Sequence, residues 1–128
     1  MPRTELDDSN ILRTYDDNGN EIHARFPDGN ECNYEYDSNN NLTHYKDSTG
    51  LEAWMEYDSN GKQIHYRDSE GDEAWFEYDD HGNETYYKNS RGVELWFEHD
   101  SDGKLIYARD AAGREVQIHP DDQRGISK

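Results

Sequence analysis

The sequence predicts an all-β fold: an antiparallel meander of about ten short strands built from five 21-residue repeats, forming a curled sheet, a half-pipe or a barrel. Three observations predict it. Asp and Gly recur in columns 21 residues apart, turn signals recur about every ten residues, and the segments between them are short and alternate in polarity. Composition alone is typical of disorder, because only 30% of residues are hydrophobic and the formal net charge is −17. A periodic fold explains the glycine columns, and disorder does not.

Five units without gaps divide the chain into an N-terminal edge segment (1–14), a repeat domain (15–119) and a polar C-terminal tail (120–128). The edge segment is expected to contain one strand, over 11–14. Each unit holds two turns, one of which always has glycine at its end because that position requires a positive φ. These glycines are Gly29, Gly50, Gly71, Gly92 and Gly113.

The segments between turns, such as 63–67 and 73–78, are rich in aromatic and β-branched residues and too short for helices. Pairing across the second turn of each unit sets a basic residue opposite a glutamate, and such pairs fix the register. One face of the sheet then carries Trp, His, Glu and basic residues. The other carries Ala, Ile, Met, Phe and Tyr and needs a cover, from curling, which we favour, or from a face-to-face homodimer. The charge pairs are Arg25–Glu31, Lys46–Glu52, Arg67–Glu73, Lys88–Glu94 and Arg109–Glu115.

Enzyme chemistry finds no support in the sequence, and we expect no catalytic residues, no metal site and no cofactor. The turn serines repeat from unit to unit, as structural residues do. His23, His44 and His65 form a column, but equivalent positions lie two strands apart, roughly 9.6 Å, which is too far for one metal ion. Acidic turns such as 16–19 lack the spacing of a calcium loop. Cys32 is the single cysteine, so the chain has no internal disulfide.

Charge and hydropathy restrict the partners. With 13 Lys and Arg against 30 Asp and Glu, direct nucleic-acid binding is not expected, because phosphate contacts need basic residues. The apolar runs are too short to span a membrane. The first residues lack the apolar stretch of a secretory signal, so we expect a cytoplasmic location.

The face that carries tryptophan offers candidate partner-binding residues. Its tryptophans recur every 21 residues and either pack on neighbouring Lys or Arg stems or form a binding stripe. Two columns of glutamate on the same face would form rows of negative charge. The candidate residues are Trp54, Trp75, Trp96, Glu52, Glu73, Glu94, Glu56, Glu77 and Glu98.

The segments Tyr57-Asp58-Ser59-Asn60-Gly61-Lys62-Gln63-Ile64 and Glu77-Tyr78-Asp79-Asp80-His81-Gly82-Asn83 resemble the YD repeat of Rhs and teneurin-type proteins. The resemblance covers residues 15–119. It implies a β-meander, because in that family the repeats form β-hairpin strips that wind into a hollow shell around a toxic payload. In size and charge the chain is also similar to small acidic immunity proteins and to phage-encoded inhibitors that mimic nucleic acid.

Two functional hypotheses follow. The first is a non-enzymatic acidic protein that captures and inhibits a basic partner, such as a nuclease, a toxin or another nucleic-acid-binding protein, acting as an immunity protein or a phage inhibitor. The second is a structural YD-repeat strip that self-assembles and whose acidity serves solubility only. A carbohydrate-binding module is a weaker third.

Overall fold

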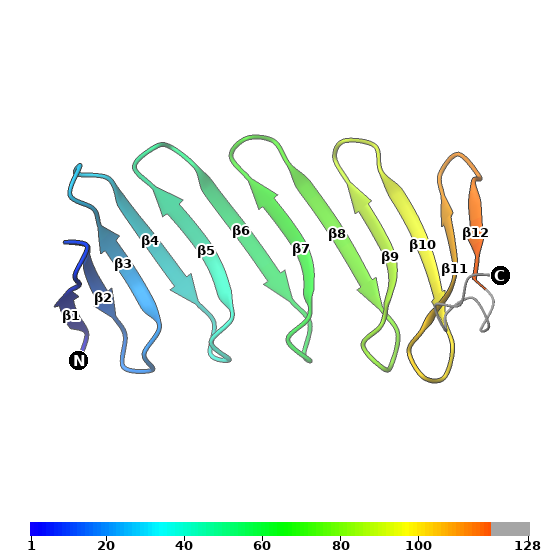
Figure 1. The fold of residues 1–128 in the computed structure, drawn as a ribbon, viewed down its shortest axis with the longest axis horizontal. Coiled ribbons are helices and arrows are strands. Elements are labelled where there is room, and N and C mark those ends of the chain that lie inside the picture. Colours follow the sequence, from blue (N-terminus) through cyan, green and yellow to red (C-terminus); the bar gives the residue numbers. More distant parts are fainter. Residues whose placement is uncertain (119–128) are drawn as a thin grey trace. The chain divides into compact units, whose positions relative to one another are not determined.

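Residues 1–118 are described by the computed structural model, and within them the chain forms twelve β-strands and no helix. The strands are β1 (Arg3–Leu6), β2 (Leu12–Tyr15), β3 (Glu21–Arg25), β4 (Glu31–Tyr36), β5 (Leu42–Asp47), β6 (Glu52–Tyr57), β7 (Gln63–Asp68), β8 (Glu73–Tyr78), β9 (Glu84–Asn89), β10 (Glu94–His99), β11 (Leu105–Asp110) and β12 (Glu115–Gln117). The strand order follows the chain order, and consecutive strands run antiparallel within β1–β7 and within β8–β12 (Figure 1).

The chain divides after β7 into two compact units, Met1–Asp72 and Glu73–Lys128. The first holds β1–β7, and the described part of the second holds β8–β12. The all-β meander expected from the repeats is confirmed. In the strand order β1 comes first and β12 last. The expected tail, 120–128, lies outside the described residues.

Most turns use the side chain of their first residue as a brace, and the turn after β3, which begins at Phe26, is an exception. In the turn after β6, the Asp58 N–H donates to the Lys62 carbonyl oxygen at 2.8 Å and Gly61 donates back to Asp58 at 3.0 Å. The Asp58 carboxylate accepts the backbone N–H groups of Asn60 and Lys62, both at 2.9 Å. Gly61 has a φ of 83°, which a residue with a Cβ adopts only with strain. The loop is therefore a type I turn closed by a glycine bulge, as the sequence predicted.

The predicted register is confirmed for the charge pairs within either unit. Arg25 opposes Glu31, Lys46 opposes Glu52, Lys88 opposes Glu94 and Arg109 opposes Glu115. The ten strands expected in the repeat domain are β3 to β12, and β2 is the expected strand of the edge segment. The strand β1 was not predicted, and it pairs with β2 from Arg3–Tyr15 to Leu6–Leu12.

In each unit the strands form a single layer, and the buried apolar side chains are small. Only alanines are buried among the apolar side chains of the described residues, and no large side chain there is fully buried. Ala53 is 6% exposed and lies opposite Tyr45. The Tyr34 and Tyr45 rings are 5.3 Å apart between centroids, and Phe76 and Tyr87 repeat this contact at 5.3 Å. We call this surface the aromatic face and the opposite surface the charged face.

Candidate partner-binding face

The charged face is built from side chains that alternate with those of the aromatic face along every strand. In the first unit it carries Glu52, Trp54 and Glu56 on β6. In the second unit β8 and β10 each repeat the order Glu, Trp and Glu at the same places. All nine residues expected at the binding face therefore lie on strands, on the face that the alternation assigned to them.

The first glutamates of β6 and β10 are each engaged within their own hairpin. The Glu52 carboxylate pairs with His44 Nε2 at 2.7 Å, and Glu94 accepts the Tyr86 hydroxyl at 2.5 Å. This hydrogen bond to Glu94 raises the pKa of Tyr86 to about 12. The paired Glu52 side chain is also partly buried, with 29% of its surface exposed.

The side-chain partner of Glu31, in the same column as Glu52, is a histidine and not the arginine that the sequence suggested. Arg25 opposes Glu31 in the register, but the Glu31 carboxylate pairs with His23 Nε2 at 2.7 Å. The hydrogen bond from His23, with a smaller contribution from the charge of Arg25, lowers the pKa of Glu31. The histidine column is therefore a structural partner of the glutamate column.

The basic residues of the face instead cover the tryptophans. The Arg67 guanidinium carbon lies 4.1 Å from the Trp54 ring centroid, and Arg109 lies 4.0 Å from that of Trp96. On Trp54 a second ring, His44, stacks at 5.6 Å between centroids. The expected packing of tryptophan on neighbouring basic stems is present, and the energy of such a contact is about 0.5–1 kcal/mol at an exposed site.

Trp75 is the most open of the three tryptophans, with 36% of its surface exposed. Its basic neighbour, Lys88, places the ammonium nitrogen 5.8 Å from the ring centroid, so it covers the ring less closely. Within the second unit, Trp75 is therefore the tryptophan that offers the most apolar surface to a partner.

The second glutamate of each set extends into solvent. Glu56, Glu77 and Glu98 are all exposed, and the Glu56 side chain keeps 69% of its surface accessible at 3.7 Å from His65 Nδ1. This column, rather than the column of Glu52, supplies the accessible negative charge of the face.

A serine latch between hairpins was missed by the sequence reasoning. The Ser69 hydroxyl accepts the Glu52 N–H at 2.9 Å, and the Ser69 N–H donates to the Glu52 carbonyl oxygen at 2.7 Å. The same two bonds join Ser48 to Glu31 and Ser90 to Glu73. The signal was a serine column placed 17 residues after the glutamate column.

The described residues contain no group of three or more His, Cys, Asp or Glu arranged to hold a metal ion. Over the same part of the chain, no helix is long and apolar enough to cross a membrane. The charged face offers ion pairs such as His44–Glu52 and tryptophan rings covered by arginine side chains.

Comparison with known proteins now identifies the family. A family model described as Teneurin YD-shell matches residues 3–125. The chain therefore belongs to the teneurin YD-shell family, which confirms the resemblance seen in its repeats. Among curated protein sequences, none matches the chain.

Several solved structures share the fold of this chain. The crystal structure of TcdB2-TccC3-TEV matches with a TM-score of 0.69 and 18% identity over 79% of this chain and 5% of that chain. The Photorhabdus luminescens Tc holotoxin pore with a TccC3 mutation matches with a TM-score of 0.68 and 18% identity over 79% of this chain and 5% of that chain. TcdB2-TccC3 matches with a TM-score of 0.67 and 18% identity over 79% of this chain and 6% of that chain. The chain thus spans about a twentieth of the length of each of these three matched chains.

Proposed function

We propose that the chain is a non-enzymatic structural strip of the YD-shell type, which assembles with further strands at its edge. The observation that carries the proposal is the serine latch. At Glu31, Glu52 and Glu73 the N–H group finds its acceptor in a serine hydroxyl of the next hairpin's turn, so one hairpin completes the hydrogen bonding of another. A module of this kind leaves unfilled positions wherever the series stops.

The edge strand β12 presents such positions. The Asp110 N–H bonds to the Arg114 carbonyl oxygen, and Arg109 opposes Glu115 as the next pair. Because hydrogen-bonded and non-hydrogen-bonded pairs alternate along an antiparallel ladder, the N–H groups of Glu115 and Gln117 point away from β11. They are donors ready to pair with an added strand.

The comparisons support the same proposal. The chain corresponds to about a twentieth of the much longer TcdB2-TccC3 chains, so the fold occurs there as part of a larger protein. The engagement of Glu52 and Glu94 with side chains of their own hairpins also favours a structural role for much of the charged face.

The test is the molar mass in solution, measured by light scattering across protein concentration at low and high salt. High salt screens repulsion between chains of net charge −17, so assembly is expected to increase with both variables. Gln117→Pro removes one outward donor and should weaken assembly, whereas Gln117→Val keeps that donor and should not. A monomer under every condition, or equal assembly of the two variants, contradicts the proposal.

A second function, capture of a basic partner as an immunity protein or inhibitor, is favoured by one observation. Glu77 and Glu98 stand exposed on the charged face of the second unit, which also carries Trp75 with 36% of its surface exposed. A regular anionic surface attracts a cationic protein over long range and speeds its association. For either function we propose a location in the cytoplasm, because the chain has a single cysteine and disulfides are rare in that compartment.

Capture is tested by affinity purification from host lysate at low salt, followed by elution at high salt. Glu77→Lys with Glu98→Lys should abolish recovery of a basic nuclease or toxin. Asp80→Lys with Asp102→Lys changes the charge equally at exposed turn positions and should reduce recovery far less. Equal recovery by the two double variants would mean that the charged face does not select the partner.

A further inference from the structure

We propose that the aromatic face of the second unit carries a binding site for the tyrosine side chain of a partner polypeptide. The site lies over Ala108, in a hollow of about 290 Å³ lined by Leu95, Asp110, Arg114 and Val116. A second hollow of about 500 Å³ shares Leu95, Asp110 and Arg114 with it. We call the five residues Leu95, Ala108, Asp110, Arg114 and Val116 the phenol notch.

The repeat itself identifies the occupant. The position of Ala108 is held by tyrosine in the three preceding 21-residue repeats, at Tyr45, Tyr66 and Tyr87. There the ring lies against the strand before it, as Tyr87 does on Phe76 at 5.3 Å between centroids. One repeat further along the chain, Phe97 occupies the place of Phe76 and opposes only the methyl group of Ala108. The hollow is the space that the missing ring would fill.

The polar end of the notch is also set by the repeat. The hydroxyls of Tyr45 and Tyr66 donate to the carboxylates of Asp47 and Asp68, each at 2.7 Å. Asp110 occupies the same repeat position as Asp47 and Asp68, in the last repeat. A phenol entering the notch would therefore find the acceptor that tyrosines of this chain already use.

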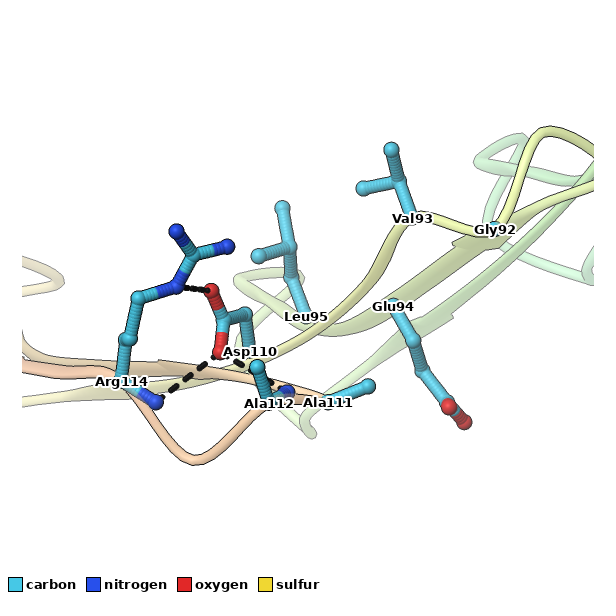
Figure 2. A pocket seen from close by; sticks show the side chains of 8 residues that line it. All are labelled: Gly92, Val93, Glu94, Leu95, Asp110, Ala111, Ala112 and Arg114. Carbon is cyan, nitrogen blue, oxygen red and sulfur yellow. Dashed lines mark hydrogen bonds and ion pairs between the residues drawn. The ribbon is translucent and has the colours of Figure 1, made fainter.

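Asp110 retains capacity for that hydrogen bond. One carboxylate oxygen accepts the Ala112 and Arg114 N–H groups, and the other accepts Arg114 Nε at 2.7 Å (Figure 2). A carboxylate oxygen has two acceptor positions, so the second oxygen can accept a phenol beside the guanidinium. The Arg114 side chain is 84% exposed and free to move aside.

The apolar wall of the notch is accessible. Val116 lies opposite Ala108 and is 59% exposed, and Val93, in the adjoining hollow, is 41% exposed. By contrast Ala24, the alanine at this repeat position in the first repeat, is 0% exposed. A small residue at this position therefore leaves an open site only in the last repeat.

The first test uses N-acetyl-tyrosinamide as the probe and methyl NMR signals of Leu95 and Val116 as the readout. We expect saturable shifts with a dissociation constant on the order of millimolar, as suits so small a ligand. N-acetyl-phenylalaninamide, which lacks the hydroxyl, should bind about five-fold more weakly. Ala108→Tyr fills the notch and should abolish the shifts. Shifts that persist in Ala108→Tyr, or no shifts in the wild-type protein, overturn the proposal.

A second test reverses the hydrogen bond and does not depend on the folding of Ala108→Tyr. Asn89 shows what an amide does at the position of Asp110: its Oδ1 braces the turn, and its Nδ2 donates to the Tyr87 hydroxyl oxygen at 2.9 Å. Asp110→Asn should therefore accept O-methyl-tyrosine amide, a pure acceptor, at least as well as tyrosinamide. The wild-type protein should prefer tyrosinamide. An unchanged order of preference overturns the proposal.

Discussion

The hydroxyl of Tyr57 donates a 2.6 Å hydrogen bond to the backbone carbonyl oxygen of Leu42, fifteen residues earlier. Tyr36 makes the same bond to the carbonyl oxygen of Glu21 at 2.7 Å. In both hairpins the tyrosine ends the second strand and the carbonyl belongs to the first residue of the first strand. The bond therefore closes the open end of the hairpin, opposite its turn. Burial raises the pKa of Tyr57 and Tyr36, so the donating form persists at neutral pH.

Tyr57→Phe removes this closure and leaves the Leu42 carbonyl without the hydroxyl donor. We expect the free energy of unfolding to fall by about 1 kcal/mol, the usual net contribution of one hydrogen bond. Urea denaturation followed by circular dichroism measures it. Tyr15→Phe is the control, because the Tyr15 hydroxyl makes no hydrogen bond within the described chain, and its effect should stay within about 0.5 kcal/mol.

His99→Tyr should stabilise the second unit. His99 ends β10 at the place where Tyr57 ends β6, and its Nδ1 is buried without a hydrogen-bond partner among the described residues. A tyrosine there would direct its hydroxyl toward the carbonyl of Glu84, the first residue of β9. We expect a gain of about 1 kcal/mol, from the new bond and from removal of an unpaired buried nitrogen. A lower urea midpoint for His99→Tyr would contradict this assignment.

Ser69→Ala should open the latch between Glu52 and the turn that follows β7. The Glu52 N–H loses its side-chain acceptor, which we expect to cost about 1 kcal/mol. Amide hydrogen exchange at Glu52 should accelerate by more than the global loss of stability explains. Ser59→Ala is the matched control, since Ser59 is an exposed serine of the other turn type and its removal should change the free energy of unfolding by less than about 0.5 kcal/mol.

Stability should fall in acid because of the turn carboxylates. Backbone N–H donors, foremost those of Asn20, Asn41 and Asn83, lower the pKa of Asp16, Asp37 and Asp79. A carboxyl group with a lowered folded pKa stabilises fully above its unfolded pKa, about 3.9, and loses this contribution as the pH falls through the folded value. The free energy of unfolding should therefore drop below about pH 4.

The matching variant replaces these three aspartates by asparagine. Asn89 shows that an amide oxygen can brace the same turn, accepting the N–H groups of Arg91 at 2.9 Å and Val93 at 3.1 Å. Urea denaturation at a series of pH values should give a shallower acid slope for the triple variant than for the wild-type protein. Identical slopes would show that other groups control the acid response.

The sequence predicted the features that depend on backbone geometry. Turn glycines such as Gly61 require a positive φ, and the column of charge pairs has only one register that opposes opposite charges. It failed where side chains choose between neighbours. Glu31 can reach His23 or Arg25 on the same face, and periodicity does not decide between them. The serine latch escaped because serine is also an ordinary turn residue.

The missed strand β1 has a different cause. Asp7 begins the first turn only nine residues before Asp16, whereas later turns are ten or eleven residues apart, so β1 falls outside the 21-residue period. The candidate binding residues were placed on the predicted face because alternation along a strand fixes their direction. Their accessibility was not predictable, since it depends on which glutamates meet a histidine or tyrosine.

The aspartates that brace the turns also contribute to the negative charge of the protein. Nine of the eleven turns joining the described strands begin with an aspartate whose carboxylate accepts backbone N–H groups. The negative charges are therefore part of the turn structure itself. Lengthening such a strip by whole repeats would add further anions with every hairpin. Its behaviour would approach that of a folded polyelectrolyte, whose compactness depends on the counterions around it.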